Sequence, residues 1–459
     1  MLVGFRRDRL TWLVYVVGAW FAYLQAGPGL VVVHLRDELD LSYAAGGLHV
    51  AAFAAGSTVA GLASARLEGW LGRRKLLWSA AALLGAGVVG LTVGSIVEVT
   101  VGSVLVMGIG GGLVLGTVQA ALADHHGEFR TVALAEENVA VSISYLTLVG
   151  VLSLAAALQL GWRVALLASL VVPIMAWWCS RRVSIEAPPP SHAVGGRLPV
   201  VFWIAAAMLF CTTAAEWCVT AWGATFVQDA AGVSSATAVA VMAAYFGGVL
   251  VGRTLGSRLA RQYGPARLLA IALGVTAAGF AVLWPSTTPA PALAGLSLLG
   301  IGLGNLFPMG VSLAVALAPG QSALASGRVV AMSSFAVVLA PLTVGTLADE
   351  TSLKMALGVV PVMVVLAAAG LTLVARTQAR IATQLKGPVR PHVPSATSRC
   401  RLPVEHDAAR VSPVAQVEQT KVDLRQAGAP GRESDRYENL QIRCQRTSAD
   451  REETCFQMT

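Results

Sequence analysis

Long apolar runs constrain this chain more than any other feature of its sequence. The chain has 459 residues, of which 55% are hydrophobic and only 13% are charged. The apolar residues gather in runs of roughly 20 or more, the length that a helix needs to cross the ~30 Å hydrocarbon core of a bilayer. The sequence therefore predicts an all-α membrane protein whose main surroundings are lipid.

Twelve such runs are expected to form membrane-spanning helices. The first begins at about Leu10. It is too long for the core of a signal peptide, so we expect it to be retained as a span. The expected spans are residues 10–34, 43–67, 76–96, 99–123, 132–157, 162–180, 200–226, 235–259, 267–284, 291–317, 326–348 and 353–375.

Charges between the runs predict the orientation of the chain. Before residue 376, 16 of the 19 Lys and Arg residues lie at or near alternate gaps, whereas the other gaps hold acidic residues such as Asp37, Asp229 and Asp349. Because cytoplasmic loops are enriched in Lys and Arg, both termini are predicted to be cytoplasmic. The net charge of +8 then reflects membrane topology and not a nucleic-acid partner.

The chain also repeats itself. The string GIGGG at Gly108–Gly112 recurs as GIGLG at Gly300–Gly304, and the same offset of 192 relates most of 41–142 to 233–334. An even number of spans separates equivalent positions, so the two repeats are parallel. The predicted organisation is a six-helix bundle at 1–180, a cytoplasmic linker at 181–199, a second six-helix bundle at 200–375 and a disordered cytoplasmic tail at 376–459.

The loop after the second run carries a family motif. Gly72, Arg73 and Arg74 match the end of the Gly-x-Leu-Ala-Asp-x-x-Gly-Arg-Arg/Lys motif, although Ala65 replaces its first Gly and Gly69 its Asp. Together with twelve spans and the repeat, this motif makes residues 10–375 resemble the major facilitator superfamily. The resemblance implies alternating access, with the first, fourth, seventh and tenth spans lining a central cavity.

Polar side chains inside the runs mark a candidate binding site, because such groups are costly in lipid and usually face a cavity or a partner. Glu216 is the one carboxylate well inside a predicted span, and burial opposes its ionisation, which suits a group that binds and releases a proton. The open alternatives are a structural hydrogen bond or a position in the outer vestibule, and plain interhelical bonding for the amides. The predicted substrate- and proton-binding residues are Gln25, Gln119, Glu216, Trp217, Trp222 and Asn305.

A second group of residues is predicted to form a cytoplasmic gate. When the cavity faces outward, Glu136 or Glu137 is expected to pair with Arg253 or Arg258, and Arg328 with Glu68 or its loop. Gly72 is expected to allow a tight turn. The alternative is that the Arg side chains extend to the interface and that the carboxylates are ordinary helix-end charges. The gate candidates are Glu68, Gly72, Arg73, Arg74, Glu136, Glu137, Arg253, Arg258 and Arg328.

These patterns predict a transporter. The sequence shows no constellation typical of an enzyme, and its six cysteines have no metal-ligand spacing, so no cofactor or metal is expected. Val104 stands where related drug/proton antiporters carry an Arg, which favours import, and Glu216 with Trp222 loosely resembles fucose permeases. We expect a monomeric permease in the bacterial inner membrane that acts as a proton symporter of a small organic solute. The alternatives are an antiporter that exports drugs or metabolites, and a membrane sensor that transports nothing.

Overall fold

The apolar runs form helices, since a backbone in lipid must satisfy its hydrogen bonds internally. The computed structural model describes residues 5–181, 183, 185, 197–260, 262–318 and 321–385. Its elements are α1 (Arg9–Leu39), α2 (Tyr43–Leu71), α3 (Arg73–Val93), α4 (Val97–His126), η1 (Gly127–Phe129), α5 (Arg130–Ala157), α6 (Trp162–Ala168), α7 (Val171–Cys179), α8 (Val200–Ala231), α9 (Ser235–Leu259), α10 (Pro265–Leu283), α11 (Pro289–Ala316), α12 (Ser322–Glu350), α13 (Leu353–Ala356) and α14 (Val359–Leu385).

The expected number of spans is confirmed. Within the described residues, twelve helical segments are long and apolar enough to cross a membrane. Ten are single helices, and the sixth and twelfth are each divided into a short and a longer piece, α6 with α7 and α13 with α14. Pro173 and Pro361 lie near the start of the second piece, where a proline ring opposes a helical hydrogen bond to the preceding turn.

The last span continues beyond its expected end. Helix α14 runs to Leu385, so residues 376–385, which were predicted to belong to the disordered tail, are helical. This stretch contains Ala, Arg, Gln and Leu but no Gly or Pro, and such residues favour a helix once a preceding span has nucleated it. The rest of the predicted tail lies outside the described residues, as do positions 182, 184 and 186–196 of the predicted linker.

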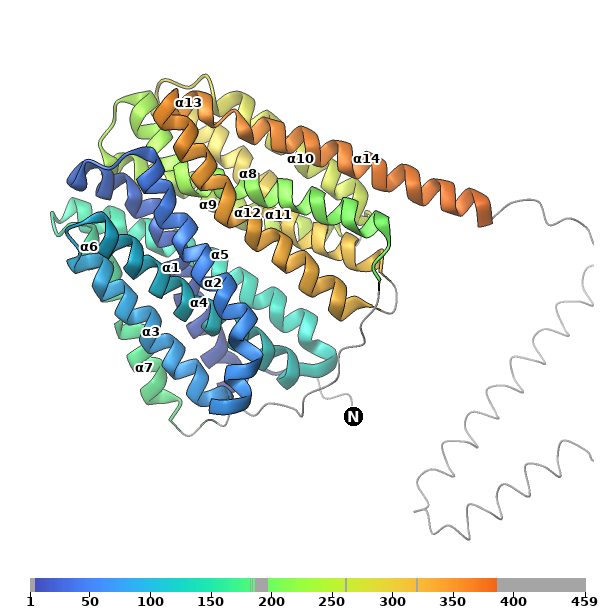
Figure 1. Ribbon diagram of the computed structural model, residues 1–459, viewed down its shortest axis with the longest axis horizontal. Coiled ribbons are helices and arrows are strands. Elements are labelled where there is room, and N and C mark those ends of the chain that lie inside the picture. Colours follow the sequence, from blue (N-terminus) through green and yellow to red (C-terminus); the bar gives the residue numbers. More distant parts are fainter. Residues whose placement is uncertain are drawn as a thin grey trace, which may run out of the picture. The chain divides into compact units, whose positions relative to one another are not determined.

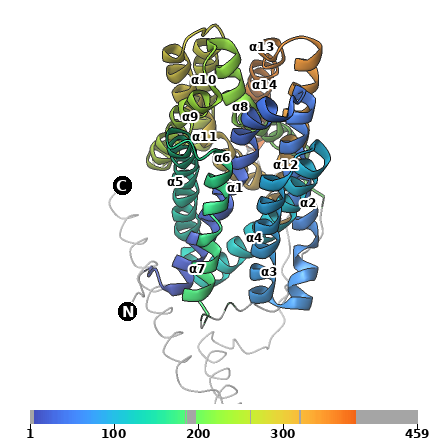
Figure 2. The same cartoon turned by 90° about the vertical axis from the view of Figure 1, so that its left-hand side faces the viewer.

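The helices form two groups. Figure 1 shows α1–α7, coloured blue to green, on one side and α8–α14, coloured green to orange, on the other. The groups touch chiefly where α2 packs on α12, α5 on α9 and α1 on α8, and Figure 2 shows α2 beside α12. The predicted fold of two parallel six-helix bundles is confirmed. We call the ends of the bundle the acidic end, where Asp37, Asp229 and Asp349 lie, and the basic end, where Arg73 lies.

Equivalent residues of the two repeats form equivalent helix caps and helix–helix contacts. Ser42 caps α2 and Ser234 caps α9, each with a side-chain oxygen that accepts from a backbone N–H three residues later. A side chain on Gly108 would run into the carbonyl of Phe53, and one on Gly300 into the carbonyl of Tyr245. All these positions differ by 192, so the repeat read from the sequence is a repeat of helix contacts.

One titratable residue inside a span is a packing residue. His49 on α2 is completely buried. Its Nε2 lies 2.9 Å from Thr100 Oγ1 on α4, and its Nδ1 lies 2.8 Å from the carbonyl oxygen of Ala45. Both ring nitrogens are therefore satisfied by groups that hold α2 against α4.

The close approach of α2 and α4 can be tested with two glycines of α4. An added Cβ at Gly108 meets backbone atoms of Phe53, whereas one at Gly102 meets nothing within 4 Å. Gly102→Ala should stabilise the protein slightly, because Ala exceeds Gly by roughly 0.5–1 kcal/mol in a helix. Gly108→Ala should destabilise it by about 1–3 kcal/mol. Thermal unfolding in detergent measures both, and an equal response of the two variants would contradict the packing.

Candidate functional site

A cavity lies between the two groups of helices. Its internal volume is about 20 Å³, and it is lined by Ala26 of α1, Tyr145 of α5, Glu216, Trp217 and Thr220 of α8, and Tyr245, Phe246 and Val249 of α9. Both halves contribute to it, and ligand sites favour such interfaces between domains. This space holds about one water molecule, so the two halves pack closely around it in this conformation.

Glu216 is the charged group of this cavity. Its side chain is partly buried, and no hydrogen bond or ion pair to its carboxylate forms within the described part of the chain. One turn along the same helix, the Thr220 hydroxyl donates to the Glu216 carbonyl oxygen at 2.9 Å, and it lies 3.2 Å from the Tyr245 hydroxyl of α9. The carboxylate is thus left available to a ligand or a proton.

Aromatic rings surround the carboxylate. The ring of Tyr145 lies 5.2 Å from that of Phe246, which in turn lies 5.1 Å from that of Tyr245. These spacings are typical of interacting aromatic pairs and give the cavity flat apolar walls. The Tyr145 hydroxyl donates to Gln25 Oε1 at 3.0 Å, which links α5 to α1 beside the cavity.

The structure brings together some of the predicted binding residues. Glu216 and Trp217 line the cavity, and Gln25 touches it through Tyr145. Trp222 does not line it, because six helical positions turn it by roughly 240° from Glu216. Its fully buried indole N–H instead donates to the Pro341 carbonyl oxygen at 2.9 Å.

The two other amides also lie elsewhere. Asn305 donates from Nδ2 to the Gly252 carbonyl oxygen at 2.5 Å, so it joins α11 to α9 and does not line the cavity. Asn305 therefore has the alternative role considered for the amides, a hydrogen bond between helices. Gln119 is exposed and is likewise not part of the cavity wall.

Six cavity residues were not predicted from the sequence: Ala26, Tyr145, Thr220, Tyr245, Phe246 and Val249. The sequence signal that pointed to the site was a carboxylate or an amide inside an apolar run. Applied to phenols, it would have found Tyr145 and Tyr245. Phe246 carries no polar signal and could be found only from the packing of α5 on α9.

At the acidic end, the halves are joined by direct polar contacts. The Asp349 carboxylate of α12 accepts from the backbone N–H groups of Tyr43 at 2.7 Å and Ala44 at 2.8 Å, in the first turn of α2. The Tyr43 hydroxyl donates to Asp229 Oδ2 at 2.8 Å, and Gln228 Nε2 donates to Asp37 Oδ2 at 3.1 Å. An anion at a helix N-terminus is stabilised by free N–H groups and the helix dipole. We call these contacts the acidic-end closure.

Arg73 and Arg74 hold the loop at the basic end. Gly72 adopts φ = 75°, which confirms the tight turn expected there. The nearly buried Arg73 pairs with Glu68 at 2.9 Å and with Asp124 of α4 at 2.9 Å, so the motif ties α2, α3 and α4 together. Arg74 donates to the carbonyl oxygens of Arg181 and Val183.

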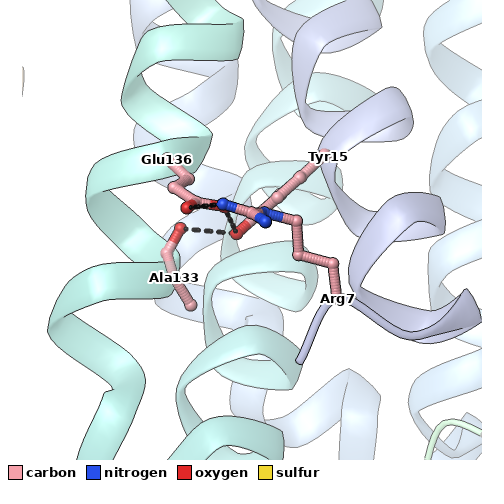
Figure 3. A network of polar contacts seen from close by, with 4 residues as sticks. All are labelled: Arg7, Tyr15, Ala133 and Glu136. Carbon is pink, nitrogen blue, oxygen red and sulfur yellow. Dashed lines mark hydrogen bonds and ion pairs between the residues drawn. The ribbon is translucent and has the colours of Figure 1, made fainter. Parts of the chain in front are cut away.

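The predicted gate pairs are absent from this conformation, among the residues described. Glu136 pairs instead with Arg7, at 2.6 Å, and accepts from the Tyr15 hydroxyl at 3.2 Å (Figure 3). Arg253 of α9 reaches the other half and donates to Ser142 Oγ of α5 at 2.9 Å. Arg258 and Arg328 are exposed. Charge pairing at the basic end therefore stays mostly within the first half.

Comparison with known proteins identifies the family. The sequence profile described as "Major Facilitator Superfamily" matches residues 11–240 and 205–415. The chain belongs to the Major Facilitator Superfamily. A comparison with curated proteins finds no match.

Solved structures of this superfamily share its fold. A bacterial homologue of the human lysosomal transporter Spinster, inward-facing and unoccupied, aligns with TM-score 0.64 and 13% identity over 81% of this chain and 98% of that one. The nucleoside transporter NupG (D323A mutant) aligns with TM-score 0.65 and 13% identity over 80% and 99%. A D-xylose–proton symporter aligns with TM-score 0.65 and 17% identity over 79% and 96%. At these identities the likeness concerns the fold alone.

The Asp349 contact can be tested by hydrogen exchange. Asp349→Asn removes the charge that holds the first amides of α2, and losing such a cap costs about 0.5–2 kcal/mol. Exchange of amides 43 and 44 should therefore accelerate by roughly 2- to 30-fold. Asp40→Asn, an exposed acidic-end change, is the control. Equal exchange in Asp349→Asn and wild type would contradict the assigned contact.

Proposed function

We propose that this chain is a secondary active transporter that moves a small organic solute, coupled to protons, by alternating access. The observation that carries the proposal is the cavity between the halves, with Glu216 facing aromatic walls. Aromatic faces bind the apolar surface of a ring-shaped solute, and a carboxylate accepts hydrogen bonds from its hydroxyl or amine groups. Relatives of this fold include proteins named a nucleoside transporter and a D-xylose–proton symporter.

The membrane orientation follows from charge. The basic end carries Arg73, Arg74 and Lys75 in one loop, and cytoplasmic loops are enriched in such residues. We therefore place the basic end and both termini in the cytoplasm, and the acidic end outside the inner membrane of a bacterium. The chain acts as a monomer in this proposal.

The conformation is then closed to the outside. Asp349, Tyr43 and Asp229 join the halves at the outer end. At the inner end, Arg253 of α9 donates to Ser142 Oγ and to the Asn138 carbonyl oxygen of α5. Rocking the halves about the cavity would open the outer end and bring the inner ends together.

The cytoplasmic gate belongs to the other conformation. As the inner ends approach, Arg253 would exchange Ser142 for Glu136, which lies six residues, or about 1.7 turns, nearer the start of α5. Because these two positions face different sides of α5, the exchange requires the halves to rotate as well as to approach. Glu136 would then leave Arg7, and the ion pair would hold the inner end shut. Arg328 and Arg258 are exposed here and are free to approach the first half in that state.

Proton coupling is tested by replacing Glu216. Glu216→Gln keeps the size of the side chain but cannot change its charge. Proton-driven uptake should fall by about tenfold or more, because a hydrogen bond to a charged group contributes roughly 1.5–3 kcal/mol. The assay is accumulation of sugars, organic acids and dyes in proteoliposomes with an imposed pH gradient, with the exposed Glu350→Gln as control. Unchanged coupled uptake would remove Glu216 from the mechanism, and gradient-driven efflux would favour the antiporter.

The gate is tested by exchanging charges. Glu136→Arg and Arg253→Glu should each impair transport, and the double variant should recover it because the pair is restored with reversed polarity. The matched control combines Glu136→Arg with Arg7→Glu, which restores only the pair seen within the first half. Rescue by Arg7→Glu but not by Arg253→Glu would contradict the gate.

A further inference from the structure

Glu137 is a buried carboxyl that the cavity and the acidic-end closure do not use. It lies on α5 with 3% of its surface exposed. No hydrogen bond or ion pair to its side chain is formed by the described residues. Its neighbour Glu136 is in contrast partly exposed and has Arg7 and Tyr15 as partners. Two adjacent carboxyls of one helix thus have opposite surroundings.

The surroundings of Glu137 are apolar and close. Its Oε1 lies where a Cβ on Gly18 of α1 would be only 3.0 Å away, and Val118 of α4 borders the same point. Gly18 therefore provides the room that the carboxyl occupies between α1, α4 and α5. An ionised carboxylate in such a place, with no donor and no cation, is strongly disfavoured, and the neutral acid is the form that fits.

Charged groups on the neighbouring helices have other partners. From α1, Arg7 precedes the helix and binds Glu136, and Tyr15 donates to Glu136 as well. From α4, His126 Nε2 lies 2.8 Å from Thr11 Oγ1. From α9, Arg253 donates to Ser142 Oγ, and from α6, Arg163 pairs with Glu38 at 2.7 Å.

Helix α1 presents a row of contacts that leads to Glu137 from the basic end. Thr11, Tyr15 and Gly18 are spaced by four and three residues, so they share one face of α1. Thr11 meets His126, Tyr15 meets Glu136, and Gly18 meets Glu137. Seven residues of helix correspond to about 10 Å. Titratable groups therefore follow one another from the surface to the buried carboxyl (Figure 3 shows the middle step).

At the surface end of this row, a carboxylate lies beside two histidines. Asp8 lies before α1 and pairs with His125 Nε2 at 2.7 Å. Partial burial opposes the charge of Asp8, but bonds from the Thr11 N–H and hydroxyl and the nearby His125 hold the pKa of Asp8 below its ordinary value. Asp8 is thus a persistent anion beside the imidazole groups of His125 and His126.

We propose that Glu137 is a proton-binding carboxyl of the first half, loaded from the basic end along the α1–α5 contact and separate from Glu216. The step is a simple protonation, in which one proton from water passes by the histidines and Glu136 and converts the Glu137 carboxylate to the neutral acid. Movement of α1 against α5 would expose Glu137 to water and release the proton. The proposal requires no solute and no role for Glu216.

Infrared spectroscopy of the purified full-length protein tests the proposal directly. In a Glu216→Gln background, the spectrum at neutral pH should contain the carbonyl band of a buried protonated carboxylic acid. Adding Glu137→Gln should abolish this band and should reduce, by one per molecule, the protons released when the pH is raised from neutral to strongly alkaline. Adding Glu136→Gln, the matched control on the same helix turn, should leave the band in place. A band that survives Glu137→Gln, or that disappears with Glu136→Gln, would overturn the proposal.

A second pair of variants keeps the test informative if Glu137→Gln does not fold. Gly18→Ala places a methyl group against the carboxyl and should shift the frequency of the band without removing it. Gly150→Ala on α5, where an added Cβ meets nothing within 4 Å, should leave the frequency unchanged. Equal spectra for the two alanine variants would show that the protonated group is not Glu137.

Discussion

The absence of water from the bilayer core is the constraint on which the structure depends. It makes every span a helix, because only a helix satisfies its own backbone, and it makes each unpaired charge inside a span costly. With hydrocarbon on the outside, apolar side chains give little reason for one helix to prefer another. The helices associate instead through close backbone contact, as where Gly108 meets Phe53 and Gly300 meets Tyr245, and through hydrogen bonds such as that from His49 to Thr100.

The same constraint separates structural polar groups from available ones. Asn305 and Trp222 are polar and buried, yet each has a backbone carbonyl as its partner, so each holds two helices together. Glu216 and Glu137 lack such partners in the described chain. Glu216 lies in the cavity between the halves, and Glu137 lies inside the N-terminal half, against Gly18. Their placement is the reason for proposing two proton-binding carboxyls in one molecule.

Much of the architecture could be predicted because it depends on patterns along the chain. Apolar length specified twelve spans, and the offset of 192 identified contacts that recur in both halves. Gly72 predicted a turn, and the turn has a positive φ at this residue. The predictions that were missed or wrong concerned contacts between segments that are distant in the sequence. The sequence gives no sign that Glu136 faces Arg7, that Asp349 caps α2, or that Tyr145 and Phe246 meet across the cavity. Trp222 lies only six residues from Glu216, but it faces another side of α8 and therefore contacts α12.

The central claim is that the two halves rock about the cavity, and distances at both ends test it most directly. Spin labels at Leu160 and Thr287 report on the acidic end, and labels at Trp70 and Gln262 report on the basic end. Electron–electron resonance should give two populations for each pair, with the acidic-end distance long when the basic-end distance is short. Lowering the pH or introducing Glu216→Gln should shift the acidic-end distances and the basic-end distances in opposite directions, one pair toward long and the other toward short. A single distance at each end that neither change affects would contradict alternating access.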